Sequence, residues 1–380
     1  MPLVEGQIVA GMRPFLLTPA GSGLAGAFRQ NRNETTAPVS LLQTWKHVQE
    51  WRKLLHESTA ETSVEIIHAH SFAAGMASVR ASSSVVYQLS RPVEKMAASA
   101  GHCNEDSWLA RSFRVAEQFV LSRAAAVVVS DHAARLECLE RGVGAENLFL
   151  ILRPVDPNLI ESVPDREWLE RTTESGPETI FFLIPGLPNS SAWECRDSLL
   201  RWMRVLSIVR RESSDVKFLF LSDREQENRV NELAAACDLL ASARVLAPAV
   251  RDKAMASADV IICEREHASE GSALEALARS RALLAADAEQ HREISSDGRG
   301  CLWFRSGDVA DIAHRARFLA ANPQFRRALG MAGREHCLAT RGAEVIASQY
   351  DAVYRLAFSK RKDHETSPPK ARLIPLHVGG

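Results

Sequence analysis

The chain has 380 residues, which is too long for one ordinary hydrophobic core and indicates two domains. Lys and Arg number 46 against 47 Asp and Glu, so the formal net charge of -1 excludes a global positive field that could hold nucleic acid or an anionic membrane. The seven cysteines are scattered without a C-x-x-C pair, which argues against a structural zinc site or a disulfide framework and favours a reducing cytoplasm.

Strand-like and helix-like segments alternate along most of the chain, the pattern of parallel sheets covered by helices. Residues 7–14 are expected to end a first helix and 15–19 to form a second strand, so the opening strand and Gly-rich turn of a nucleotide-type domain are expected to be missing. The segment 131–141 is predicted to be a helix capped by Ser130 and ended by Gly142. Further strands of the first domain are predicted at 64–67, 83–89, 126–130 and 148–152.

Residues 154–177 interrupt this alternation with prolines, charges and little periodicity, and we expect them to be an interdomain linker. The domains are then 1–153 and 178–342. Strands of the second are predicted at 179–184, 216–221, 243–246, 259–263, 282–286 and 300–304, and late helices at 308–321, 324–339 and 343–358. The tail 359–380 has no core-forming pattern and is expected to be disordered.

Polar residues of the first domain have two competing interpretations. His68 and His70 end a predicted strand, where a spacing of two puts both side chains on one face, at the sheet edge where open α/β sheets bind ligands. A ligand-facing role and a merely structural one are given even weight. A metal site is disfavoured because no third ligand lies nearby in the sequence. Glu117, on a helix with Arg114 and Arg123, is expected on a solvated face.

Six segments taken together resemble one known family. They are EIIHAHSFAAG, AAAVVVSDHAARLECLERG, PVDPNLI, ADVIICERE, EGSALEALARSRALLAAD and HREISSDGRGCLWFRSGD. In this order, over residues 7–358, they resemble the family 4 glycosyltransferases (glycosyl transferases group 1) of the GT-B fold. The resemblance implies two Rossmann-like domains whose parallel sheets face a cleft, with the helix 343–358 returning to the first domain. It also implies sugar transfer from a nucleotide-sugar, with retention of configuration and without a metal.

The same resemblance indicates where the donor would bind. A diphosphate leaving group needs cations, backbone N–H groups and a helix dipole, and a helix beginning at Gly271 and Ser272 would supply the dipole. Glu275 matches the second carboxylate of the family's E-x7-E motif. The resemblance implies that carboxylates at this turn hold the sugar and ribose hydroxyls, since an ionised carboxylate accepts two hydrogen bonds. Counting back from Glu275 places His267 where the first carboxylate is expected, whereas counting forward from Ala258-Asp259 places Ala268 there. Glu266 and Glu270 are the candidate replacements.

Several family positions carry a different residue here. The Gly-Arg turn is found as Gly186-Leu187, and Glu194 stands where a Lys is expected. Ser90 stands where the resemblance implies a histidine near the sugar. His70 and His267 are the candidate catalytic residues. Arg196 is the candidate replacement cation, with Arg265 as a second, although a surface position is the simpler interpretation of both.

Two functions therefore remain open. The first is a nucleotide-sugar glycosyltransferase, using a UDP- or GDP-sugar and no cofactor, that acts on a glycan, lipid or small-molecule acceptor. The second is a catalytically degenerate relative that serves as a binding or scaffold partner, for example of an active glycosyltransferase; a nucleotide-sugar epimerase is a weaker third. No leader and no membrane-spanning run is found, so we expect a cytoplasmic protein, and the resemblance also allows a peripheral contact with the inner face of a membrane.

Overall fold

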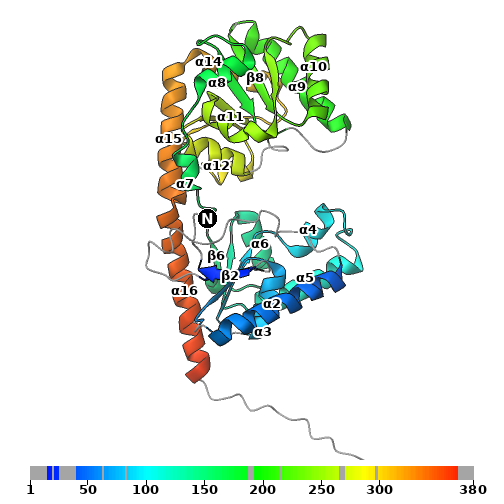
Figure 1. The fold of residues 1–380 in the computed structure, drawn as a ribbon, viewed down its shortest axis with the longest axis vertical. Coiled ribbons are helices and arrows are strands. Elements are labelled where there is room, and N and C mark those ends of the chain that lie inside the picture. Colours follow the sequence, from blue (N-terminus) through cyan, green and yellow to red (C-terminus); the bar gives the residue numbers. More distant parts are fainter. Residues whose placement is uncertain are drawn as a thin grey trace, which may run out of the picture. The chain divides into compact units, whose positions relative to one another are not determined.

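The chain forms two compact units, each with its own parallel sheet (Figure 1). The computed structural model describes residues 15–18, 21–24, 40–61, 64–81, 84–186, 192–213, 215–264, 270–295 and 298–366. Unit 1 takes the described residues up to Arg153 and those from Ile346 onward, whereas unit 2 takes Pro154–Val345. The chain therefore passes from one unit to the other twice.

Unit 1 is built on four parallel strands in the order β3-β4-β5-β6. These strands are β3 Ile67–Ala69, β4 Val85–Leu89, β5 Ala126–Val129 and β6 Leu148–Leu150. The helices that precede and link them are α2 Leu41–Glu61, α3 Phe72–Ala81, α4 Val93–Ser99, α5 Trp108–Arg123 and α6 His132–Glu140. The strands predicted at 83–89, 126–130 and 148–152 are present, because runs such as AVVV are buried on both faces, as central strands are. The strand predicted at 64–67 lies slightly later, as β3.

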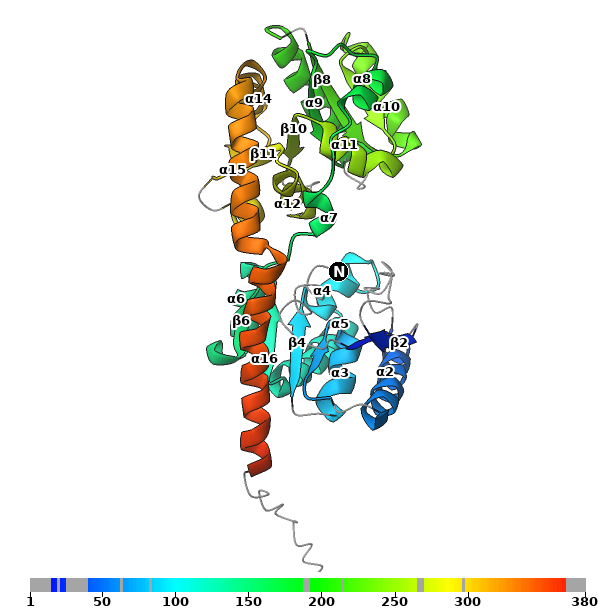
Figure 2. The ribbon, with the colours of Figure 1, turned by 60° about the vertical axis from the view of Figure 1, so that its left-hand side comes forward.

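Each face of this sheet has its own cover, since alternate side chains point to opposite sides. Val85 and Tyr87 belong to the cluster packed by α2, α3, α5 and α6, whereas Val86 and Val128 pack against α16 (Ala343–Thr366). The apolar stripe of α16 has helical spacing and consists of Ile346, Tyr350, Val353 and Ala357. Figure 2 shows α16 running along the sheet of unit 1.

The helix α16 continues beyond the point predicted from the sequence. It was expected to end at Phe358, with a disordered tail from Ser359, but it runs to Thr366. The side chain of Lys360 explains part of this extension, because its Nζ donates to the backbone oxygen of Ala125 at 2.8 Å and to Asn147 Oδ1. The hydrophobic pattern does not reveal such polar contacts.

Two other expectations for unit 1 are corrected. The segment Phe15–Thr18 (β1) is not a strand of the parallel sheet; it pairs antiparallel with Gly21–Leu24 (β2) in a separate hairpin. Two linking residues suffice for a hairpin, whereas a parallel partner needs a crossover of about a dozen residues. The cap of α6 is Asp131 rather than Ser130, since its Oδ1 accepts from the Ala134 N–H at 2.7 Å. Residues 7–14 lie outside the described part.

Unit 2 is built on six parallel strands in the order β12-β11-β10-β7-β8-β9. The strands are β7 Ile180–Ile184, β8 Val216–Leu221, β9 Ala243–Leu246, β10 Val260–Cys263, β11 Ala282–Ala286 and β12 Cys301–Phe304. The helices are α7 Pro157–Ile160, α8 Arg166–Thr173, α9 Ala192–Arg210, α10 Arg224–Ala236, α11 Arg251–Ser257, α12 Glu270–Ala278, α13 Glu289–Arg292, α14 Val309–Ala321 and α15 Pro323–Arg341.

The two faces of this sheet are covered by different helices. Phe182 and Phe218 belong to the cluster formed with α9, α10 and α14. Phe181 and Leu219, their neighbours in sequence, belong to the cluster formed with α8, α11, α12 and α15. Alternation of buried side chains between two helix layers is what a doubly covered parallel sheet requires.

Residues 154–177, expected to be a linker, are instead part of unit 2. They contain α8, whose Leu169 is fully buried against the sheet. Asp165 caps this helix by accepting from the Trp168 N–H at 2.9 Å. The helix α8 was not predicted because prolines and charged residues dominate this segment. The two apolar residues of α8, Trp168 and Leu169, both pack against the core.

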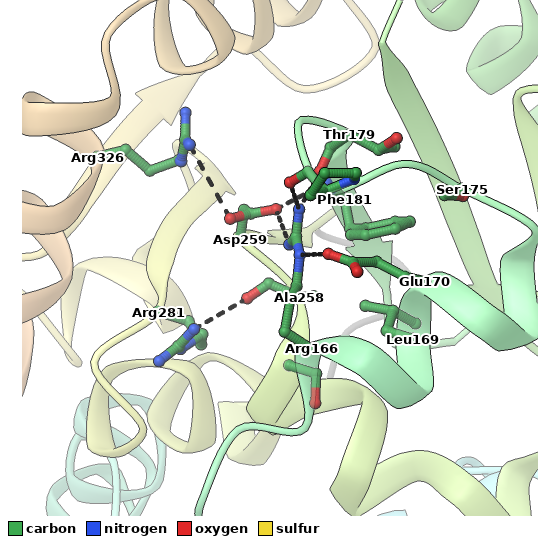
Figure 3. Close-up of polar contacts among 12 residues, drawn as sticks. Arg166, Leu169, Glu170, Ser175, Thr179, Phe181, Ala258, Asp259, Arg281 and Arg326 are labelled. Atoms are coloured by element: carbon green, nitrogen blue, oxygen red, sulfur yellow. Dashed lines mark hydrogen bonds and ion pairs between the residues drawn. The ribbon is translucent and has the colours of Figure 1, made fainter.

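A polar cluster fixes α8 to the amino ends of β7 and β10 (Figure 3). Asp259 Oδ2 accepts from Arg166 Nη1 at 2.7 Å and from the Phe181 N–H at 2.9 Å. The Arg326 Nη2 atom, on α15, lies 3.9 Å from the other carboxylate oxygen. One carboxylate thus joins an arginine of α8, the backbone of the central strand β7 and an arginine of α15.

Candidate functional site

Three predicted donor-site residues of unit 2, Gly186, Gly271 and Ser272, lie at the carboxyl ends of its two central strands, β7 and β10. Pro185 and half-buried Gly186 follow β7, and buried Glu264 follows β10. The helix α12 begins six positions after Glu264, so its first turn, with Gly271 and Ser272, stands at the same edge. This is the edge at which open α/β sheets bind ligands.

An arginine that the sequence analysis did not select, Arg251, reaches the start of α12. It is the first residue of α11, and its Nη2 donates to Ser272 Oγ at 3.0 Å. The same atom lies 3.1 Å from Glu275 Oε2, and the Arg251 and Glu275 side chains are 30% and 25% exposed. Arg251 lies outside every family-like segment, and a single arginine at a helix start carries no sequence signal of its own.

A second ion pair stands at the same edge. Arg201 of α9 contacts Glu264 Oε1 through Nη1 and lies 3.4 Å from Asp197 Oδ2 through Nη2. Partial burial would lower the pKa of Arg201, but Glu264 and Asp197 outweigh it and the pKa is raised. Both terminal nitrogens of Arg201 are therefore occupied by carboxylates.

Cys263, the last residue of β10, lies beneath these groups. Burial raises the pKa of its thiol to about 12; Arg251 opposes this shift and Glu275 adds to it. Because only the thiolate is a nucleophile, Cys263 is inert at neutral pH and acts as a small apolar residue of the core.

Other predicted positions of this site fall partly outside the described residues. Leu187, Arg265 and His267 are outside them altogether, and so are the side chains of Glu194 and Glu270. Glu270 is nevertheless the first helical residue of α12. The candidate cation Arg196 lies on α9 with its side chain exposed.

The two histidines of unit 1, His68 in β3 and His70 directly after it, lie on the same side, as their spacing predicts. Their ring centroids are 4.0 Å apart. His68 Nδ1 hydrogen-bonds with the Tyr354 hydroxyl of α16 at 2.8 Å, and the pKa of His68 is well below its ordinary value because of burial and the nearby His70. His68 is thus an anchor for α16, whereas His70, at the end of the strand, is exposed.

Glu117 does not lie on a solvated face, contrary to the expectation. It is fully buried, accepting from the Tyr87 hydroxyl at 3.0 Å, the Val93 N–H at 3.3 Å and Arg141 Nη1 at 3.1 Å. Burial raises its pKa to about 7; Arg141 opposes this shift and Glu94 adds to it. Its helical neighbours Arg114 and Arg123 gave the misleading signal.

A metal site and a membrane span are both absent from the described residues. No group of three or more His, Cys, Asp or Glu side chains in this part of the chain could hold a metal ion. Among the helices described, none is both long and apolar enough to span a membrane.

Family models match two parts of the chain. Residues 1–153 match the glycosyl transferase 4-like domain, and residues 223–350 match a glycosyl transferase-like domain. The chain belongs to the family 4 (group 1) glycosyltransferases. Its fold of two units with parallel sheets is the GT-B fold, as predicted, and its function is glycosyltransferase-like. A search of curated protein sequences finds no match.

Solved structures agree with this glycosyltransferase fold. Sucrose-phosphate synthase from Thermosynechococcus elongatus is 16% identical, with 94% of this chain and 92% of that chain covered and a TM-score of 0.61. A glycosyltransferase from Rickettsia africae ESF-5 is 12% identical, with coverages of 93% and 94% and a TM-score of 0.62. HepE of Anabaena in complex with UDP is 16% identical, with coverages of 83% and 82% and a TM-score of 0.59. At these identities the likeness concerns the fold.

Proposed function

We propose that this protein is a glycosyltransferase that takes its sugar from a nucleoside-diphosphate sugar and binds that donor at the carboxyl edge of the unit 2 sheet. The acceptor is a glycan, a lipid or a small molecule, and the anomeric configuration is retained, without a metal or another cofactor. The protein works in the cytoplasm, with peripheral contact at the inner face of the membrane if the acceptor is a lipid.

The start of α12 is the observation that carries this proposal. The first N–H groups of a helix have no partner within it, and the helix dipole adds partial positive charge, so this end suits a diphosphate. Glu275, one turn further along, is partly exposed and can accept two hydrogen bonds from ribose hydroxyls. Solved complexes of HepE with UDP and with UDP-glucose support testing UDP-sugars first.

A second candidate function is a degenerate glycosyltransferase that binds a partner, such as an active glycosyltransferase, and performs no transfer. Leu187 and Glu194 favour it, because they stand where cations are expected. The binding of Arg201 to two carboxylates favours it as well, since this arginine is not available to neutralise phosphates.

Isothermal titration of the purified protein with UDP, GDP and their sugars separates the two functions. Donor binding predicts a micromolar dissociation constant that Glu275→Ala weakens by about 10- to 100-fold, because a charge-assisted hydrogen bond contributes roughly 1.5–3 kcal/mol. The matched control is Glu335→Ala, which removes an exposed carboxylate on α15.

Absence of binding with every nucleotide would exclude the transferase function. Binding without release of sugar from any donor, in the presence of candidate acceptors, would favour the degenerate relative. Where transfer occurs, the anomeric configuration of the product, read by NMR, tests retention.

A further inference from the structure

Arg251 and Arg201 differ in how many of their N–H groups are in use. An arginine has five N–H groups, all donors. In Arg201, each terminal nitrogen faces a carboxylate. In Arg251, a single nitrogen, Nη2, serves both Ser272 and Glu275, whereas Nη1 is buried and has no hydrogen-bond partner among the described residues. Arg251 therefore has donors left for a ligand.

The ion pair between Arg251 and Glu275 is weak enough to be exchanged. Both side chains are partly exposed, at 30% and 25%, and pairs with such access to water contribute little to stability. A phosphate oxygen offers the same guanidinium a charge-assisted hydrogen bond in the more enclosed setting of a bound ligand. Exchange of carboxylate for phosphate would also release Glu275 to the ribose hydroxyls.

The position of Arg251 fits a diphosphate at the start of α12. The hydroxyl that it contacts belongs to Ser272, in the first turn of this nine-residue helix. A phosphate bound by the N–H groups of that turn would thus lie beside the guanidinium. The cation and the helix dipole would then act on the same negative charge.

We propose that Arg251 is the phosphate-binding cation of this glycosyltransferase, in place of the cations expected at Leu187 and Glu194. Arg251 comes from the helix after β9, not from the loop after β7. In the free protein, Glu275 and Ser272 hold the Arg251 guanidinium next to the place where the phosphates bind. When the donor binds, the guanidinium moves from the Glu275 carboxylate to the phosphates. This inference rests on the proposed function.

The test compares UDP, which carries phosphates, with uridine, which does not. Dissociation constants of both are measured for the wild type, Arg251→Gln and Arg251→Lys, by calorimetry for UDP and by NMR titration for uridine. Arg251→Gln is expected to weaken UDP binding by about 10- to 100-fold and to leave uridine binding within about twofold. Arg251→Lys should recover part of the UDP affinity. The control is Arg204→Gln, which removes another exposed arginine of α9 and should change neither constant. Arg196→Gln is measured beside it, because Arg196 is the competing candidate cation.

Each contrary outcome has its own meaning. Equal weakening of UDP and uridine in both Arg251 variants would overturn the proposal, because Arg251 would then only position Glu275. Unchanged UDP binding in Arg251→Gln would overturn it too, as would a loss of UDP affinity in Arg196→Gln alone. A wild type that binds neither UDP nor GDP would overturn the proposed function itself. Thermal unfolding of each variant shows whether it is folded.

Discussion

Glu117 is expected to make unit 1 lose stability as pH rises from acid to neutral. Its pKa in the folded protein is about 7, against an ordinary value of 4.5, mainly because the carboxyl is buried. The folded state therefore binds more protons than the unfolded state within this window. The contribution of Glu117 to stability is complete below about pH 4.5 and disappears as pH rises to about 7. The difference between the folded and the ordinary pKa corresponds to roughly 3 kcal/mol.

The assay compares wild type with Glu117→Gln, which keeps the size of the side chain and removes its titration. Because the two units can unfold separately, hydrogen exchange of the β4 and β5 amides is followed, so that only unit 1 is read. Between about pH 4.5 and 7.5, the opening free energy of wild type should fall by roughly 3 kcal/mol relative to the variant. Taking the difference cancels His68, whose lowered pKa acts in the opposite direction.

Parallel pH profiles for the two proteins would refute this reasoning. They would mean that Glu117 stays ionised throughout, held by Arg141, in spite of its burial. Glu140→Gln is the matched control, since Glu140 is an exposed carboxylate on α6 of the same unit and should not alter the profile.

Two further changes test contacts described above. Asp259→Asn removes the charge that faces Arg166 and Arg326. Because the Asp259 side chain is only 22% exposed, we expect the urea unfolding free energy of unit 2 to fall by roughly 2–4 kcal/mol, with no comparable loss in the control Glu335→Gln. A loss below about 0.5 kcal/mol would contradict a central role for this carboxylate. Tyr354→Phe removes the hydrogen bond to His68 and should lower the stability of unit 1 by about 1 kcal/mol, measured by hydrogen exchange of the β3 amides. Unchanged exchange would mean that water replaces the hydroxyl at no cost.

The sheets of both units could be predicted from the sequence, because their strands are continuous apolar runs that need no knowledge of distant residues. The segments AVVV and VIIC are examples, and each became a central strand within one residue of its predicted bounds. Helix ends were less accessible. The extension of α16 depends on the contact of Lys360 with Ala125, which lies 235 positions away.

The candidate site could be predicted only in part. Glu275, Gly271 and Ser272 were found because they lie together in one family-like segment of α12. Arg251 was missed because it reaches that segment from another helix, 21 positions earlier, and only the packing of α11 against α12 joins them. Glu117 was misjudged for a related reason: its partner Arg141 is 24 positions away, so burial of the pair leaves no local pattern.

Because the chain passes between the units twice, unit 1 consists of two separate pieces of the polypeptide, one ending at Arg153 and one beginning at Ile346. A fragment that stops at Arg153 would lack the stripe of α16 that covers Val86 and Val128, and its bare sheet face would favour aggregation. A protease nick between Arg153 and Pro154 would have a milder effect, because helix packing would still hold the two pieces together. Anyone dissecting this protein would do better to co-express 1–153 with 154–380 than to cut it into its apparent halves.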